Sequence, residues 1–323
     1  MAALPERQLA AVDGYRIGPL LHAGAHCLVF RGIASATSRS VVVKISRDPY
    51  PSERDLAAQR RAYDIAREIR CDAVVAHLAL AEAGYGQALI TEDFDAVSLA
   101  QYHREHPRLA QREVLVIGIA LARSLAKLHR AGVIHLNIQP GNILWSPTRR
   151  LLKLTDLQHC SRLQQEAVQT RDQVHLPAMP VYVAPEQTGR MNRSVDARAD
   201  LYAAGVVLYE LLTGSPPFTS SDPSELIHAH LARQPAAPSA RETDLHPNVP
   251  EILLRLLQKD PDARYASADG LAGDLERCLN ELEAGTAARF PLGLRDVSER
   301  FVLPDRLYGR EPETEALRDA VEA

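Results

Sequence analysis

The chain has 323 residues, of which 37 are basic and 41 acidic, giving a net charge of −4 without any run of like charges. This balance gives no reason to expect nucleic acid or an anionic membrane as a partner. The four cysteines lie far apart and form no C-x-x-C pair, which argues against a disulfide framework or a zinc ribbon. The first residues lack the order of a signal peptide, and the longest apolar run, 114–122, is too short to span a bilayer. We therefore expect a soluble protein of the reducing cytoplasm.

The first third of the chain has the pattern of a small sheet with one helix. Residues 14–48 alternate short β-prone runs with turn residues, which predicts an antiparallel meander of three strands. Residues 52–70 contain no proline and can begin on Ser52, so a helix is expected there. A further strand is predicted at 87–91.

Beyond residue 108 the pattern becomes mainly helical. In residues 112–130 the apolar side chains recur every three or four positions, and Gly132 is placed to end that helix. Strands followed by helices predict an α+β fold. Residues 284–288 have the composition of a linker, and the chain ends in a predicted amphipathic helix. Further helices are expected at 199–213, 224–232, 250–259 and 267–283.

Residues 135–144, H-L-N-I-Q-P-G-N-I-L, resemble the catalytic loop of protein kinases, whose pattern is H-R-D-x-K-P-x-N. In that family the Asp accepts the proton of the substrate hydroxyl, the Lys meets the γ-phosphate and the Asn holds a metal ion. Here Asn137 and Gln139 stand at the Asp and Lys positions, and Asn142 matches the metal-binding Asn. The resemblance therefore implies a catalytic loop that has lost two charges.

Two further residues match the nucleotide site of the family. Only four lysines occur, and the other 33 of the 37 basic residues are arginine. Because lysine is so rare in this chain, the position of each lysine is of interest. Lys44 ends V-V-V-K on a β-prone run, as the phosphate-pairing lysine of a kinase does; taken alone, it would be a surface lysine at a strand edge. Asp156 follows a predicted strand at the place of the magnesium-binding Asp of D-F-G, with Gln158 replacing the glycine.

The resemblance also implies where adenine would bind. Glu92 and Phe94 lie in a segment that looks like the hinge between the lobes, whose backbone meets adenine, and Thr91 is at the gatekeeper position. Of the glycine-rich loop only Gly24 remains, and Cys27 occupies one outer glycine position. A Cβ atom there hinders close approach to phosphates.

Other positions depart from the family pattern. The helix after Lys44 has Ala62 where a glutamate usually pairs with the lysine; Glu53, Asp64 and Glu68 are acidic substitutes at poorer spacing. Leu136 replaces the arginine that reads an activation-loop phosphate in many kinases. Met179 stands where a threonine usually contacts the catalytic Asp.

From residue 183 onward the sequence is similar to kinase domains at the N-termini of large bacterial multidomain signalling proteins, in which an ATPase of the AAA/STAND type follows. In that family Glu186 would pair with Arg264, and Asp200 would anchor the catalytic loop from the helix beneath it. The resemblance implies a two-lobed kinase fold, with an N-lobe at 14–93, a C-lobe at 94–283, and a linker with the start of a following domain at 284–323.

The favoured hypothesis is a pseudokinase that binds ATP and Mg²⁺ through Lys44, Asn142 and Asp156 and acts as a regulatory or docking module. Its partner would be the following ATPase domain or another signalling protein. The alternative is an active serine/threonine kinase with an atypical catalytic loop.

Overall fold

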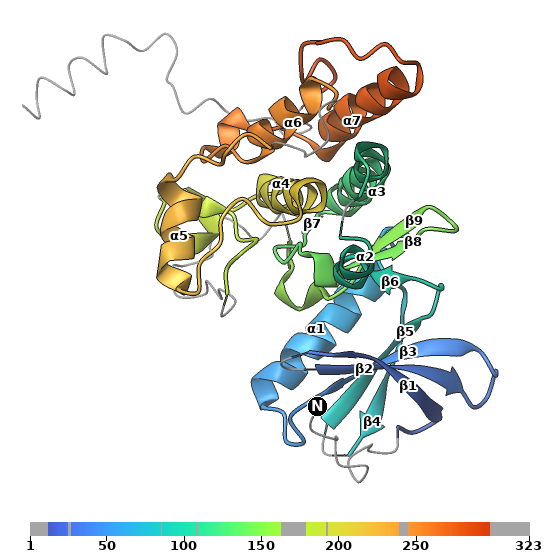
Figure 1. Cartoon of the computed structure of the whole chain (residues 1–323). Coiled ribbons are helices and arrows are strands. Elements are labelled where there is room, and N and C mark those ends of the chain that lie inside the picture. Colours follow the sequence, from blue (N-terminus) through green and yellow to red (C-terminus); the bar gives the residue numbers. More distant parts are fainter. Residues whose placement is uncertain are drawn as a thin grey trace, which may run out of the picture.

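Five antiparallel strands form the sheet of the N-lobe, in the order β1-β2-β3-β5-β4 (Figure 1). The computed structural model describes residues 12–24, 27–84, 86–107, 109–162, 179–191, 193–238 and 245–297. Within β3, Val41, Val43 and Ile45 are buried in the lobe's hydrophobic cluster, while Lys44 between them points to the opposite face. The strands are β1 (Tyr15–Ala23), β2 (Cys27–Ala34), β3 (Ser40–Ser46), β4 (His77–Ala83) and β5 (Gly86–Glu92).

The single helix of the N-lobe, α1 (Glu53–Ile69), begins where its sequence predicts. The Ser52 hydroxyl accepts a hydrogen bond from the Asp55 amide at 3.2 Å, which is an N-cap. The helix buries Ala62 and Ile65 in the large cluster that continues into the C-lobe. It therefore connects the packing of the two lobes.

The C-lobe consists mainly of helices packed around α4 (Figure 1). The apolar stripe of α3 packs against α4 and α7, where Gly118 lets Leu208 and Leu275 approach closely. Within the described residues, no helix is both long and apolar enough to cross a membrane. The helices are α2 (Leu99–Glu105), α3 (Gln111–Arg130), α4 (Arg198–Thr213), α5 (Pro223–Ala232), α6 (Asn248–Leu256) and α7 (Ala268–Glu283).

Short strands, β6 just before α2 and β7 to β10 between α3 and α4, hold the loops that the motifs occupy. β8 and β9 form a hairpin with β6 at its edge, and β7 pairs with β10. Asn142 immediately precedes β8, and Asp156 follows β9 by two residues. These strands are β6 (Val97–Ser98), β7 (Val133–Ile134), β8 (Ile143–Ser146), β9 (Leu151–Leu154) and β10 (Ser161–Arg162).

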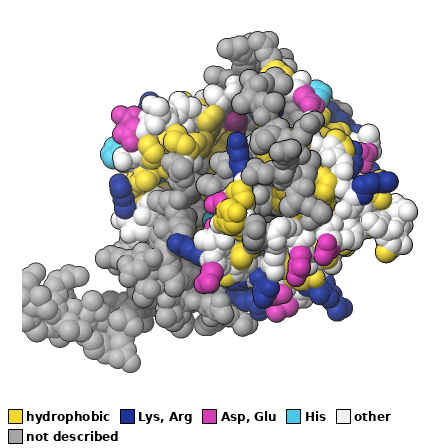
Figure 2. Space-filling model, turned by 90° about the horizontal axis from the view of Figure 1, so that it is seen from below, with side chains coloured by type: hydrophobic (Ala, Val, Ile, Leu, Met, Phe, Trp, Pro, Cys, Tyr) yellow, Lys and Arg dark blue, Asp and Glu magenta, His cyan; other side chains and the backbone are white. Residues whose placement is uncertain are grey.

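The fold class predicted from the sequence is confirmed: an antiparallel sheet with a helix precedes a helical lobe. The strand predicted at 87–91 is one residue longer at each end, since β5 runs from Gly86 to Glu92. The strand β4 was not predicted. A helix lies where one was predicted at 250–259, but α6 begins two residues earlier, at Asn248, and ends three residues earlier, at Leu256. Basic and acidic side chains are interspersed on the face shown in Figure 2.

Residues 284–297 lie against α6 and α7. The side chain of Asn248 bonds both the amide and the carbonyl of Phe290, at 3.0 and 2.8 Å, and Phe290 is buried. The Asp296 carboxylate accepts hydrogen bonds from the amides of Ala266 and Ser267 at the start of α7. The predicted terminal helix and following domain lie outside the described residues.

Candidate functional site

The central contact of the candidate site joins β3 to the segment after β9. The Nζ atom of Lys44 lies 2.6 Å from Oδ1 of Asp156, and the two side chains are 21% and 17% exposed. Burial disfavours both charged forms, but the attraction between them outweighs it, so the pKa of Lys44 is raised and that of Asp156 is lowered. Both groups are therefore charged at neutral pH.

Helix α1 uses its acidic and basic residues elsewhere. Ala62, at the position where the family has glutamate, is buried, and Glu68 pairs with Arg162 in β10. Glu53 and Asp64 are exposed. Arg61 donates to the carbonyl of Gln158 at 3.1 Å. The helix is thus tied to the segment after Asp156 rather than to Lys44.

The backbone of the catalytic-loop motif is fixed from below by α4. The buried carboxylate of Asp200 accepts hydrogen bonds from the amides of His135 and Leu136, both at 2.8 Å, and contacts His129 Nε2 at 2.9 Å. Leu136 has φ +60°, an uncommon conformation for a residue with a Cβ atom, which these bonds hold in place. Asp200 therefore connects α4 to the backbone of the loop.

His135 connects the loop to the strand that carries Asp156. Its Nε2 atom donates to the Thr155 carbonyl at 2.9 Å, and its Nδ1 atom accepts from the Asn137 amide at 3.3 Å. Burial lowers the pKa of His135, so the ring is neutral with its proton on Nε2.

Asn137, Gln139 and Asn142 form a network of amides around Asp156. The Asn137 Nδ2 atom donates to Asp156 Oδ2 at 3.3 Å, and Asn137 Oδ1 accepts from Gln139 Nε2 at 3.0 Å. The Nδ2 atom of Asn142 donates to the Asn137 carbonyl at 2.9 Å. Both polar atoms of the Asn137 side chain are engaged, and an amide cannot accept a proton from a substrate hydroxyl.

The oxygen atoms of this network fit a magnesium ion. Because Asn142 Nδ2 is bonded to Asn137, Asn142 Oδ1 is the atom that remains for a cation, and Asp156 supplies a carboxylate. Carbonyl and carboxylate oxygens are the ligands that Mg²⁺ prefers. Among the described residues, no group of three or more His, Cys, Asp or Glu side chains could hold a metal ion. Nucleotide phosphates and water molecules would complete the coordination.

The turn between β1 and β2 keeps one glycine. The Gly24 amide donates to the Cys27 carbonyl at 2.8 Å, and a Cβ atom on Gly24 would lie 3.3 Å from that oxygen. Arg47 at the end of β3 donates to the Gly24 carbonyl at 3.1 Å. Burial, with a smaller effect of Asp156, raises the pKa of Cys27, so its thiol is neutral.

At the predicted hinge the side chains face the protein. The Glu92 carboxylate accepts from the Ala76 amide at 2.8 Å and pairs with Lys153 of β9. The Lys153 Nζ atom also lies 5.3 Å from the ring centroid of Phe94, which is buried. The sequence interpretation missed Lys153, although the scarcity of lysine was a signal that could have drawn attention to it.

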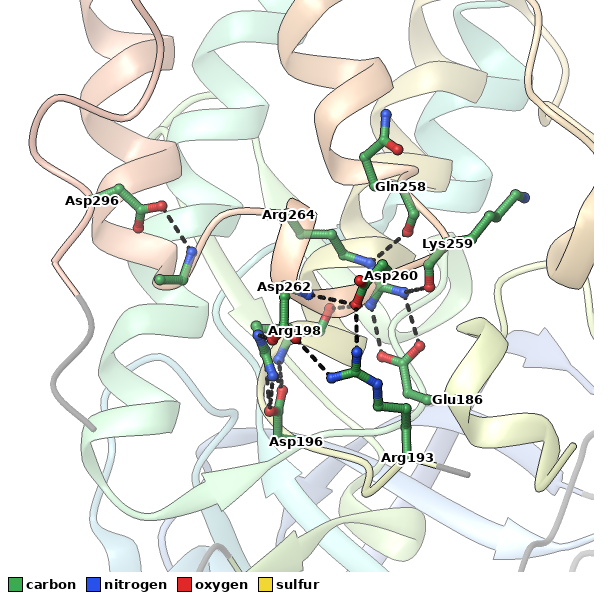
Figure 3. Close-up of polar contacts among 11 residues, drawn as sticks. Glu186, Arg193, Asp196, Arg198, Gln258, Lys259, Asp260, Asp262, Arg264 and Asp296 are labelled. Carbon is green, nitrogen blue, oxygen red and sulfur yellow. Dashed lines mark hydrogen bonds and ion pairs between the residues drawn. The ribbon is translucent and has the colours of Figure 1, made fainter. Parts of the chain in front are cut away.

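Glu186 and Arg264 form a buried bidentate ion pair that is separate from the Lys44–Asp156 contact (Figure 3). Arg264 Nη1 and Nη2 lie 2.7 and 2.8 Å from the two Glu186 oxygens, and the side chains are 0% and 1% exposed. A second group of ion pairs lies beside this pair: Arg193 contacts Asp260 and Asp262, and Arg198 contacts Asp262 and the buried Asp196.

The structure thus connects Lys44, Asp156, Asn137, Gln139 and Asn142 in one network and leaves Glu186 and Arg264 as a separate pair. Leu136 packs beside the hydrophobic cluster that includes Tyr202, whereas Met179 is exposed.

Comparison with known proteins identifies the family of the chain and two of its relatives. Residues 15–274 match the sequence model of a family described as "Protein kinase domain". The chain is 31% identical over 274 residues to the "Serine/threonine-protein kinase PknB" of Mycobacterium tuberculosis, covering 83% of this chain and 43% of that protein. It is 29% identical over 279 residues to a "Probable serine/threonine-protein kinase" of Streptomyces coelicolor, covering 85% of this chain and 41% of the relative. The chain thus spans less than half the length of these relatives.

Proposed function

Because the chain belongs to the protein kinase family, we propose that the site around Lys44 and Asp156 binds ATP with Mg²⁺ and that its capacity for phosphoryl transfer is strongly reduced. In this proposal Lys44 holds the α- and β-phosphates, and Asn142 and Asp156 hold the metal ion. The backbone of Glu92 and Phe94 meets adenine beside Thr91, and Gly24 lies in the turn over the phosphates. Bound Mg²⁺ would neutralise phosphate charge.

The observation that carries the proposal is the engaged amide of Asn137. It donates to Asp156 and accepts from Gln139, so the position of the general base holds a neutral group tied to its neighbours. Removing a positioned base costs about 10²–10⁴ in rate. Gln139 also supplies no positive charge for the γ-phosphate. Phosphoryl transfer depends on both positioning and charge neutralisation, so the two losses act on the same step.

Nucleotide binding requires an exchange of partners at Lys44. The Lys44 ammonium is paired with Asp156, and a cation that took the Asp156 carboxylate would release Lys44 for the phosphates. We therefore expect ATP and Mg²⁺ to bind cooperatively. Isothermal titration with ATP, with and without Mg²⁺, tests this. Saturable binding that is weakened by Lys44→Ala is expected, and the absence of heat in both conditions would contradict the proposal.

A second candidate is an active serine/threonine kinase with an atypical loop. The relatives' names favour it, as do the retained Lys44, Asn142 and Asp156. The two candidates differ in turnover and not in nucleotide binding. A phosphotransfer assay with generic acceptor proteins separates them, because only the second predicts substantial transfer that depends on Lys44.

We further propose that the domain serves as a regulatory or docking module in a longer signalling protein, with a following ATPase domain or another signalling protein as partner. The support is the resemblance of residues 183–218 and the share of the relatives' length that the chain covers. Reading the coding sequence past Ala323 tests it: an ATPase phosphate-binding motif is expected, and a different class of domain would contradict it.

A further inference from the structure

Lys153 is one of only four lysines, and no role in the proposed nucleotide site has been assigned to it. Its side chain is 14% exposed and pairs with Glu92, which is 27% exposed. A largely buried ion pair requires good geometry and additional hydrogen bonds to offset the loss of hydration. The Ala76 amide supplies one, donating at 2.8 Å to the same Glu92 oxygen that Lys153 contacts.

The pair lies where three segments of the chain meet. The β9 residue next to Lys153, Leu154, accepts from the Val75 amide at 2.9 Å and donates to the Ala73 carbonyl at 2.8 Å. On the other side of the same segment, the Glu92 amide donates to the Ala76 carbonyl at 3.0 Å. Residues 73–76 are thus held between β9 and the end of β5, and the Lys153–Glu92 pair closes this arrangement.

Lys153 also contacts the next hinge residue. Its Nζ atom lies 5.3 Å from the Phe94 ring centroid, within the range of a cation–π interaction. One ammonium therefore restrains the side chains of both residues whose backbone would meet adenine. Three residues further along the same segment, Asp156 provides the carboxylate for the metal ion.

We propose that Lys153 is a positioning residue for the nucleotide: with Glu92 it forms a hinge latch that fixes the backbone of residues 92–94 relative to Asp156. Hinge latch here means the contacts of Lys153 with Glu92 and Phe94 and of Glu92 with Ala76. The inference rests on the proposed nucleotide binding. In it Lys153 does not touch the nucleotide, yet sets the spacing between the adenine and metal ends of the site.

Two substitutions remove the latch with little change of shape. Lys153→Met keeps an unbranched stem beside Phe94 and removes the ammonium, whereas Glu92→Gln keeps an oxygen for the Ala76 amide. Each is expected to weaken Mg-ATP binding about tenfold, which corresponds to about 1.4 kcal/mol. The double variant should bind Mg-ATP no more weakly than either single variant, because the two substitutions remove the same interaction. Lys153→Arg, which keeps the charge, should bind within about threefold of wild type.

The chain contains a matched control. Lys127 of α3 pairs with Asp72 at 2.7 Å, so this pair also joins the C-lobe to the segment after α1, but its side chains are 47% and 74% exposed. Lys127→Met should leave the Kd of Mg-ATP unchanged. Melting temperatures recorded in parallel separate positioning from stability: a lower Tm for Lys153→Met with an unchanged Kd would overturn the proposal.

Hydrogen exchange of the ligand-free protein tests the latch independently of nucleotide. Exchange of the amides of residues 92–95 should accelerate in Lys153→Met and not in Lys127→Met. If wild type binds no nucleotide, the proposed function fails, and this exchange pattern still decides whether the latch fixes the hinge backbone. Equal exchange in wild type and Lys153→Met would refute it.

Discussion

Replacing Arg264 by methionine should destabilise the domain severely. Its guanidinium bonds both oxygens of Glu186 and also donates to the carbonyls of Arg198, Gln258 and Lys259. Methionine would leave the Glu186 carboxylate buried without its partner. Breaking a buried pair in this way costs about 3–5 kcal/mol, a large share of the roughly 5–15 kcal/mol by which a typical domain is stable.

Urea denaturation followed by circular dichroism measures the loss, with Arg193→Met as the control. Arg193 also pairs with two carboxylates, those of Asp260 and Asp262 (Figure 3), but all three side chains are well exposed. Exposed pairs contribute about 0–1 kcal/mol. Arg264→Lys keeps the positive charge but cannot bond both Glu186 oxygens, so its loss of stability should lie between those of Arg264→Met and Arg193→Met. It can still be measured if Arg264→Met does not fold. A cost for Arg264→Met no larger than that of the control would refute the reasoning.

Three further predictions follow from the site and its scaffold. The double variant Asn137→Asp with Gln139→Lys restores the carboxylate and the charge, and should raise transfer of labelled phosphate by at least about 10²; an unchanged rate would show that other positions limit the reaction. Burial, with a smaller effect of Lys259, lowers the pKa of His230 to about 4. Because the unfolded pKa is about 6.5, the stabilisation is complete above pH 6.5 and is lost as the pH falls toward 4, by about 3 kcal/mol. Denaturation at pH 7 and pH 4.5 should show that loss in wild type and much less of it in His230→Asn. A Cβ atom on Gly205 of α4 would lie 2.6 Å from Leu256 Cβ, so Gly205→Ala should cost about 1–3 kcal/mol; a variant as stable as wild type in urea would show that α4 and α6 can separate freely.

The helices and strands with a clear hydrophobic periodicity could be predicted from the sequence. The elements whose sequences lack such a periodicity could not. The three-strand meander and the helix that became α3 follow from their patterns. β4 has the sequence H-L-A-L-A-E-A, in which alanine has low strand propensity, and pairing with β5 decides its conformation. β6, β7 and β10 contain two residues each, too few for any periodicity.

The residues of the candidate site were accessible through motif spacing, but their partners were not. The sequence located Lys44 and Asp156 separately, and only the tertiary structure pairs them. Glu68 of α1, an acidic substitute for the missing helix glutamate on the evidence of the sequence, pairs with Arg162 in the structure. Contacts across long sequence separations depend on packing, which the local pattern does not encode.

The most direct test of the central claim is phosphate transfer by the purified chain. Wild type and Lys44→Ala would be incubated with ATP labelled at the γ-phosphate, Mg²⁺ or Mn²⁺, and generic acceptor proteins, at concentrations where titration shows that wild type binds nucleotide. We predict that label depending on Lys44 is at most a trace, at least about 10²-fold below that of the variant Asn137→Asp with Gln139→Lys. Label incorporated by wild type at the level of that variant and lost in Lys44→Ala would contradict the account and establish an active kinase.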